Sequence, residues 1–225
     1  MSVRRSLPDA FSLPWVHRAL VLGPVVLFLG HQWLAPTLEA RVVRDTAIYI
    51  VIPLGVAALH GRRIGWRIDR LAIRDAVLLS AFVAPFYVVG STLPTIREYY
   101  PMWQVSPAIG EFLPHAVMLF VVALATETYY RGLLCVGVRE IGFKCVFISP
   151  IVYALMHSTK PPIELALSGP TDVLFGAVDY HADSILPSTV AHGFGLVLLD
   201  WLVLHDPVID PETTLRWLSW LPMPL

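Results

Sequence analysis

The chain has 225 residues, of which 56% are hydrophobic and 15% are charged, and its formal net charge is -1. A typical soluble domain is about 25% charged, so this composition favours an integral membrane protein over a soluble one. The sequence has no basic tract with interleaved aromatic residues, which gives no reason to expect a nucleic-acid partner. Its two cysteines lack CxxC spacing and are expected to be packing residues.

The apolar segments predict an all-α, polytopic transmembrane bundle that forms a single membrane domain over residues 1–225. A helix needs about 20 apolar residues to cross a bilayer, and the pattern indicates about six to eight membrane segments. In chain order the predicted spans are 16–35, 46–60, 76–91, 113–139, 143–157, a weaker segment at 171–180, and 185–205. Residues 1–112 hold the N-terminal spans, 113–205 a core with most of the polar residues, and 206–225 an interfacial tail containing Trp217 and Trp220.

A cluster of five arginines predicts the orientation of the chain in the membrane. They lie between the second and third predicted spans, and arginine concentrates in cytoplasmic loops. We therefore expect a multi-pass protein of the cell membrane whose N-terminus, with Arg4 and Arg5, is cytoplasmic. The five residues are Arg62, Arg63, Arg67, Arg70 and Arg74.

The segment Glu127-Thr-Tyr-Tyr-Arg131-Gly132 follows directly on an apolar run. Glu127 and Arg131 are four residues apart, so they share one face of a helix. Each charge alone would cost a few kcal/mol or more at the centre of a bilayer. A charged pair at such a position indicates a function, although it also has the simpler interpretation of tying helices together.

Four more ionisable residues of the core are candidates for the same site: His157, Glu164, His192 and Asp200. Asp200 follows His192 by eight residues, or roughly two helical turns. Histidines and carboxylates gathered in a dry site can bind a divalent metal such as zinc, with His157 and His192 as possible ligands. They can also activate a water directly, with Glu as the base and His as its partner. Both alternatives predict hydrolysis, and we expect the bond that is cleaved to be a peptide bond.

Structural roles compete with these interpretations. Histidines in membrane helices often donate hydrogen bonds between helices, which is the expected role of His31, His60 and His115. Asp200 can equally lie at the membrane interface, and Glu164 in a solvated, proline-rich loop. The sequence has no HExxH, GxSxG, GxxxxGK[ST] or GxGxxG motif that would indicate another common chemistry.

Three ordered motifs resemble the CAAX protease and bacteriocin-processing family, also called CPBP or Abi. They are Glu127-Thr-Tyr-Tyr-Arg131-Gly132, then Tyr153-Ala-Leu-Met-His157, then Ser184-Ile-Leu-Pro-Ser-Thr-Val-Ala-His192. The resemblance covers about residues 114–201. It implies a multi-pass, all-helical intramembrane endopeptidase with a CAAX-protease-like core, and the family includes the eukaryotic enzyme that removes the -aaX tripeptide from prenylated proteins.

Two positions depart from the usual family motifs. Thr126 stands where the first motif has the glutamate taken to activate water, and Leu196 stands where the third has asparagine. The chain looks like a single-Glu branch that continues with His-x-x-Lys-Pro-x-x-Glu, found here as His157 to Glu164. In this interpretation Glu164 supplies the carboxylate that Thr126 lacks, and Asp200 supplies the partner that Leu196 lacks.

The chemistry of the remaining site residues predicts their roles. Glu127 is the general base or the group that orients it, and Arg131 keeps Glu127 ionised. His157 and His192 bind the water or a metal and stabilise the oxyanion. Lys160 neutralises Glu164 or stabilises the oxyanion. The expected partners are the lipid bilayer and a membrane-embedded or membrane-associated peptide or protein substrate.

Two other functions remain open from the sequence. Thr126 and Leu196 favour a catalytically inactive relative, namely a membrane scaffold or regulator that keeps the fold. Buried His, Glu and Arg residues also suit a small proton-coupled transporter.

Overall fold

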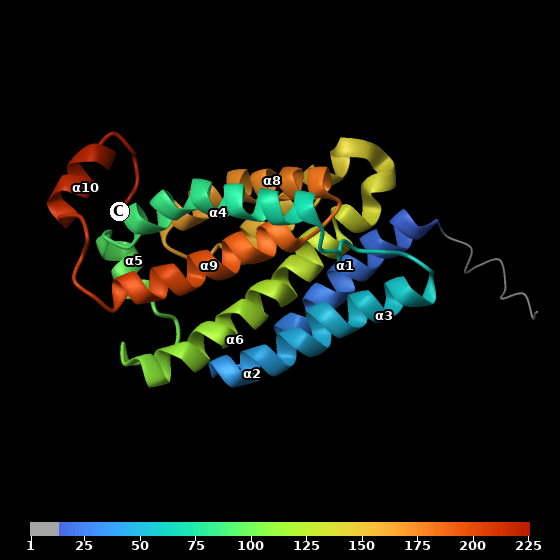
Figure 1. The fold of residues 1–225 in the computed structure, drawn as a ribbon, viewed down its shortest axis with the longest axis horizontal. Helices are drawn as coiled ribbons and strands as arrows, with labels where there is room; N and C mark the ends of the chain where they lie inside the picture. The colour runs from blue at the N-terminus through green and yellow to red at the C-terminus, as the bar shows by residue number, and fades with distance from the viewer. Residues whose placement is uncertain (1–13) are drawn as a thin grey trace, which may run out of the picture.

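The computed structural model describes residues 14–225, and these residues form a bundle of helices without a β-strand (Figure 1). The N-terminal part contains α1 (Trp15–Gln32) and a nearly continuous helix made of α2 (Leu38–Asp45), the π-helical turn η2 (Thr46–Val51) and α3 (Ile52–Leu59). α4 (Arg70–Gly90) follows, and the side chain of Asp69 caps it by accepting the backbone N–H of Ala72 at 2.9 Å. Aspartate is a preferred N-cap because it satisfies a free helix N–H group.

The C-terminal part begins with the short helix α5 (Pro94–Tyr99). α6 (Ile109–Glu127) continues into the π-helical turn η3 (Thr128–Leu133). The 3₁₀ segment η4 (Val136–Phe147) and α7 (Ser149–Met156) lead to α8 (Pro162–Ala182), α9 (Leu186–Val203) and α10 (Pro211–Leu218).

α9 is the central helix of the bundle. It packs against α4 on one side and α6 on another, and α8 lies against both α4 and α9. Figure 1 shows α6 running beside α9, with α2 along the outer edge of α6. The largest buried apolar cluster joins the N-terminal helices to η3 through Tyr49, Tyr129 and Leu133. This arrangement brings α6, α8 and α9 together around the polar residues of the core.

Four helical segments among the described residues are long and apolar enough to cross a membrane: 38–59, 70–90, 109–133 and 186–203. The expected helical membrane bundle is confirmed, but this number is lower than the six to eight segments predicted. The predicted span 113–139 ends as a helix at Leu133, because Cys135 has non-helical backbone angles (φ -124°, ψ -79°). The predicted span 143–157 is divided between η4 and the short α7, and 171–180 is part of the longer, acid-containing α8.

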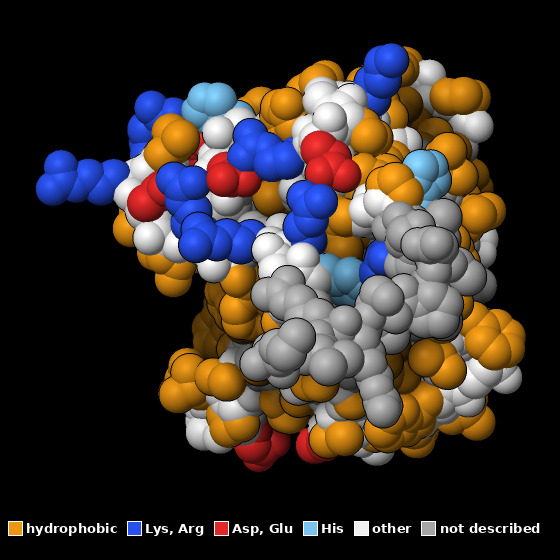
Figure 2. All heavy atoms as spheres, turned by 90° about the vertical axis from the view of Figure 1, so that its right-hand side faces the viewer, with side chains coloured by type: hydrophobic (Ala, Val, Ile, Leu, Met, Phe, Trp, Pro, Cys, Tyr) orange, Lys and Arg blue, Asp and Glu red, His pale blue; other side chains and the backbone are white. Residues whose placement is uncertain are grey.

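Charged side chains gather at the end of the bundle where α4 begins. Figure 2 views this end and shows Lys and Arg side chains among Asp and Glu. Arg62 pairs with Glu140 at 3.0 Å, and Arg67 pairs with both Asp69 and Asp183. The arginine cluster predicted from the sequence is therefore partly neutralised by local acids. Arg4 and Arg5, used for the predicted orientation, lie outside the described residues.

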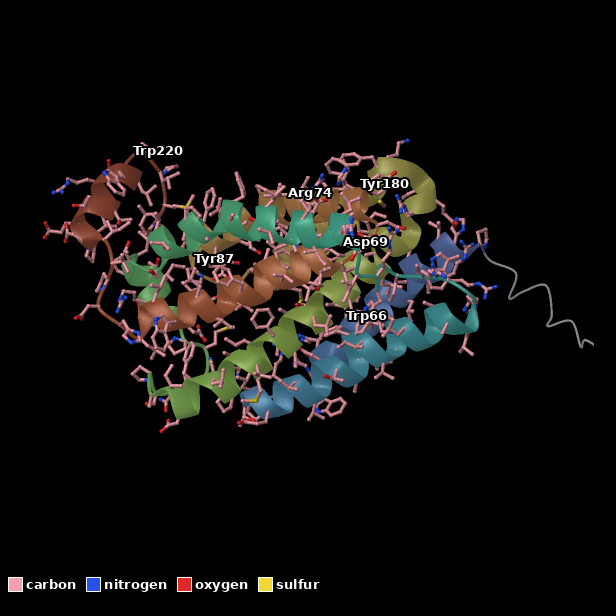
Figure 3. All side chains as sticks on the ribbon, in the orientation of Figure 1. Trp66, Asp69, Arg74, Tyr87, Tyr180 and Trp220 are labelled. Carbon is pink, nitrogen blue, oxygen red and sulfur yellow. The ribbon has the colours of Figure 1, made fainter. Side chains whose placement is uncertain are left out.

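The segment after α9 folds back onto the opposite end of the bundle. Thr214 of α10 accepts a buried hydrogen bond from Thr92, while Trp217 and Trp220 are exposed. Figure 3 shows Trp220 at this end, far from Asp69 at the start of α4. Exposed tryptophans at one end of an apolar bundle agree with the interfacial tail expected there.

Candidate active site

The predicted Glu127–Arg131 pair lies where α6 passes into the π-helical turn η3. Both side chains are fully buried, and Arg131 Nε lies 3.0 Å from Glu127 Oε2. π-helical turns inside α-helices often occur at functional sites. The sequence placed these two residues on one helical face, and the structure shows them in contact.

Arg131 has a second acidic partner that the sequence interpretation missed. Asp172 of α8 places Oδ1 2.7 Å from Arg131 Nη1, and Ser149 donates a hydrogen bond to the other oxygen of Asp172. Both ion pairs are short, but the N–H bonds of Arg131 do not point at the carboxylate oxygens, so no well-directed hydrogen bond forms between these groups. The guanidinium also faces the ring of Tyr153, 4.9 Å from its centroid.

The signal for Asp172 was present in the sequence. Asp172 is a charged residue inside the weakly apolar segment 171–180, just as Glu127 is a charged residue at the end of an apolar run. A bilayer makes such a charge costly unless it is paired. Its partner, however, comes from η3, forty-one residues earlier, and only the packing of α8 against η3 reveals it.

His192 binds Glu127 directly. His192 Nδ1 lies 2.6 Å from Glu127 Oε1, and the histidine comes from the second turn of α9. An ionised carboxylate only accepts hydrogen bonds, so Nδ1 carries the proton and Nε2 is left as an acceptor. Each carboxylate oxygen of Glu127 thus has its own partner, His192 for one and Arg131 for the other.

His157, Lys160 and Glu164 form a second polar cluster at the connection between α7 and α8. Glu164 lies in the first turn of α8 rather than in the irregular loop expected from its prolines. Its carboxylate lies 3.4 Å from Lys160 Nζ and 3.7 Å from His157 Nε2. The hydroxyl of Tyr100 donates to Glu164 at 2.9 Å and accepts from Lys160 at 2.9 Å. Tyr100 was not predicted, because it enters from the distant α5–α6 connection.

A hydrogen bond to the backbone of α7 sets the tautomer of His157 in the second cluster. His157 Nδ1 donates to the carbonyl of Tyr153 at 2.8 Å, so Nε2 is the acceptor here as well. Burial lowers the pKa of His157 and also the pKa of Lys160, and the negative charge of Glu164 opposes both effects. Tyr153 joins the two clusters, since its carbonyl binds His157 while its ring faces Arg131.

Thr126 and Leu196, the two departures from the family motifs, take no part in either cluster. The hydroxyl of Thr126 bonds back to its own helix, to the carbonyls of Val122 at 3.0 Å and Ala123 at 2.9 Å. Leu196 packs into the apolar contact between α6 and α9 that includes Leu119. Neither side chain replaces the polar group that the family motif has at its position.

Asp200 is not brought to His192. Its carboxylate lies 2.8 Å from His115 Nε2, and both side chains are buried. Eight residues separate Asp200 from His192, which is about 12 Å along a helix. The structure thus supports the helix–helix role expected for His115 and gives Asp200 a partner other than the predicted one.

The described residues do not fit the predicted zinc site. Zinc in proteins takes three or four His, Cys or carboxylate ligands. No group of three such side chains within residues 14–225 is placed to hold a metal ion. The Nδ1 atoms of His157 and His192 are each occupied by a hydrogen bond, and their Nε2 atoms belong to different clusters.

Comparison with known families identifies the segment that contains both clusters. Residues 108–197 match the sequence model of the type II CAAX prenyl endopeptidase Rce1-like family. The matched segment contains Glu127, Arg131, His157, Glu164 and His192, and it ends before Asp200. No curated protein and no solved structure shows a significant match to the chain. The resemblance to CAAX proteases is confirmed for this segment. The four long apolar helices among the described residues agree with a membrane protein.

Proposed function

We propose that the protein is an intramembrane endopeptidase in which His192 activates a water molecule and Glu127 orients His192. The observation that carries this proposal is the 2.6 Å hydrogen bond between His192 Nδ1 and Glu127 Oε1. A carboxylate bound to one nitrogen of an imidazole fixes its tautomer and stabilises the imidazolium that forms when the other nitrogen takes a proton. The match of the surrounding segment to CAAX prenyl endopeptidases supports the same reaction class.

The reaction follows from this arrangement. His192 Nε2 removes a proton from water while the water oxygen forms a bond to the peptide carbonyl carbon. The π electron pair of the carbonyl moves onto its oxygen and gives an oxyanion. When the oxyanion collapses, the C–N bond breaks, its electron pair goes to nitrogen, and His192 returns the proton to the leaving amine.

Glu127 and Arg131 support His192 through charge. Arg131 keeps the buried carboxylate ionised, because a nearby positive charge favours the charged form. An ionised Glu127 then stabilises the protonated His192 during the reaction. Asp172 forms an ion pair with a second nitrogen of Arg131, so that the buried guanidinium lies between two carboxylates.

The second cluster serves to position the α7–α8 connection. The three N–H bonds of Lys160 have three neighbours within 3.4 Å: Tyr100, Met102 and Glu164. An ammonium with three partners has no donor left for an oxyanion. We therefore assign Lys160 the neutralisation of Glu164, and we assign Glu164 and Tyr100 the fixing of His157 beside the site.

One observation favours the alternative of a catalytically inactive scaffold. The Thr126 hydroxyl is bonded to its own helix and offers no base at the position where the family motif has a glutamate. A scaffold would keep Glu127, Arg131 and His192 as a buried polar network that specifies the packing of α6 and α9. The two functions differ in whether the protein cleaves peptide bonds.

The test is cleavage by the full-length protein, purified and reconstituted in lipid nanodiscs. The probe is a library of transmembrane and juxtamembrane peptides, with and without a chelator, and the products are identified by mass spectrometry. We expect chelator-insensitive cleavage by the wild type and by Thr126→Ala, and none by His192→Ala. If the folded wild type leaves the whole library intact, or if His192→Ala cleaves as well as the wild type, the protease proposal fails.

The orientation of the protein is a separate part of the proposal. We place the charged end around Arg62 and Arg67 on the cytoplasmic face of the cell membrane, following the enrichment of arginine there. A single cysteine introduced at Arg63 should react with a membrane-impermeant thiol reagent only after cells are opened. Labelling in intact cells would reverse the orientation.

A further inference from the structure

Tyr87 of α4 reaches across to α9 at a glycine. A Cβ atom added to Gly195 would overlap the Cζ atom and the hydroxyl oxygen of Tyr87, closer than any side chain tolerates. The phenol therefore rests directly on the backbone of α9, in space that only a glycine leaves open. Figure 3 shows Tyr87 between α4 and α9.

The position of Tyr87 along α9 relates it to the site. Gly195 follows His192 by three residues, so the two share a face of the helix one turn apart. Leu196, which follows Gly195, packs toward α6 and has no polar atom to offer. Tyr87 also packs against the apolar cluster that contains Ala191, the residue that precedes His192.

The hydroxyl of Tyr87 has no hydrogen-bond partner within residues 14–225. Other tyrosines of the core are bonded: Tyr129 donates to the carbonyl of Gly23 at 3.0 Å, and Tyr100 to Glu164. A tyrosine hydroxyl inside a protein usually finds a partner. Tyr87 thus presents a free O–H on the same side of α9 as His192, where the proposed reaction develops negative charge.

The proposed reaction needs such a donor. Catalysis of peptide hydrolysis depends on hydrogen bonds aimed at the oxyanion of the tetrahedral intermediate. Lys160 has its three donors occupied, and His192 uses its Nε2 for proton transfer. Neither Thr126 nor Leu196 supplies a replacement.

We propose that the hydroxyl of Tyr87 donates a hydrogen bond to the oxyanion formed on the substrate carbonyl, as a catalytic residue of the site. This inference rests on the proposed endopeptidase function. The hydroxyl keeps its proton throughout: it stabilises the charge on the carbonyl oxygen while water adds, and it releases that oxygen when the C–N bond breaks. The proposal also requires a glycine at position 195 of α9, because a Cβ atom there would occupy the space of the phenol.

Tyr153 is the competing phenol. Its ring faces Arg131 and its hydroxyl also has no bonded partner among residues 14–225. It comes from α7, whereas the Tyr87 phenol rests on α9 within one turn of His192. Comparing the two tyrosines by the same substitution decides between them.

The test measures kcat and KM for the full-length protein on a peptide that the wild type cleaves. Tyr87→Phe removes only the oxygen and should lower kcat on the order of 100-fold with little change in KM. Gly195→Ala should lower kcat as well, because its Cβ displaces the phenol. Tyr129→Phe is the matched control, and it should retain the kcat of the wild type. Thermal unfolding of each variant verifies that it is folded.

The outcomes separate this inference from the proposed function. If the wild type cleaves and folded Tyr87→Phe keeps its kcat, Tyr87 is not the donor and the endopeptidase function stands. If Tyr153→Phe loses kcat and Tyr87→Phe does not, the donor is Tyr153. If the wild type cleaves no peptide, both proposals fail together.

Discussion

Glu127 and His192 are joined by a 2.6 Å hydrogen bond between Oε1 and Nδ1, although sixty-five residues separate them in the chain. The other carboxylate oxygen of Glu127 lies 3.0 Å from Arg131. One buried carboxylate therefore connects the end of α6 to the beginning of α9. The same contact stabilises the packing of the two helices and sets the tautomer of His192.

Removing the charge of Arg131 should destabilise the protein strongly. Arg131→Met leaves the buried Glu127 and Asp172 without a counter-charge, and breaking such a pair costs about 3–5 kcal/mol. The exposed pair Arg62–Glu140 gives the matched control, since Arg62→Met should cost about 0–1 kcal/mol. Thermal unfolding in one detergent measures both. Equal shifts for the two variants would contradict the described role of Arg131.

Asp200 should matter for stability and not for catalysis. Its carboxylate pairs with His115 at 2.8 Å, away from the Glu127–His192 contact. Asp200→Asn should lower the unfolding temperature while kcat stays within about twofold of the wild type, since sites without shared partners act independently. A loss of kcat comparable to that of Glu127→Gln would restore Asp200 to the catalytic site that the sequence suggested.

The cap of α4 should make stability depend on pH. The backbone N–H of Ala72 and the guanidinium of Arg67 lower the pKa of Asp69 in the folded protein. The ionised carboxylate therefore adds stability above its unfolded pKa of about 3.9, and this contribution is lost as pH falls toward the lower folded value.

The pH series that tests this compares the wild type with Asp69→Asn, which keeps a capping side chain without the charge. The difference in unfolding temperature between them should be constant from about pH 5 to 7 and should shrink below about pH 4. A difference that grows on acidification would mean that the folded pKa of Asp69 is raised.

The helical class and the contact between Glu127 and Arg131 were predictable because they depend on local sequence. Apolar segments of sufficient length predict helices in a membrane, and a charged pair four residues apart predicts a shared face. Glu127, Arg131 and His192 could be selected from the sequence as candidate site residues. The bounds of the helices differ from the predicted spans, because the backbone break at Cys135 and the helicity of the Pro162 segment are not visible in an apolar pattern.

The residues that the sequence did not reveal all act through distant contacts. Asp172 meets Arg131 because α8 packs on η3, and Tyr100 meets Glu164 because the α5–α6 connection folds over α8. The partner of Asp200 lies eighty-five residues away on α6. Such pairs form only through tertiary packing, and the spacing of residues along the sequence does not predict them.

The most direct test of the central claim compares kcat for Glu127→Gln and Glu164→Gln on one peptide that the wild type cleaves. Both substitutions keep the shape of the side chain and remove one negative charge. If Glu127 orients the base, Glu127→Gln should lower kcat by about 10²- to 10⁴-fold, because general-base catalysis contributes that much. Glu164→Gln, which affects only the supporting cluster, should lower it less than about tenfold. A large loss for Glu164→Gln with near wild-type cleavage by Glu127→Gln would contradict the account.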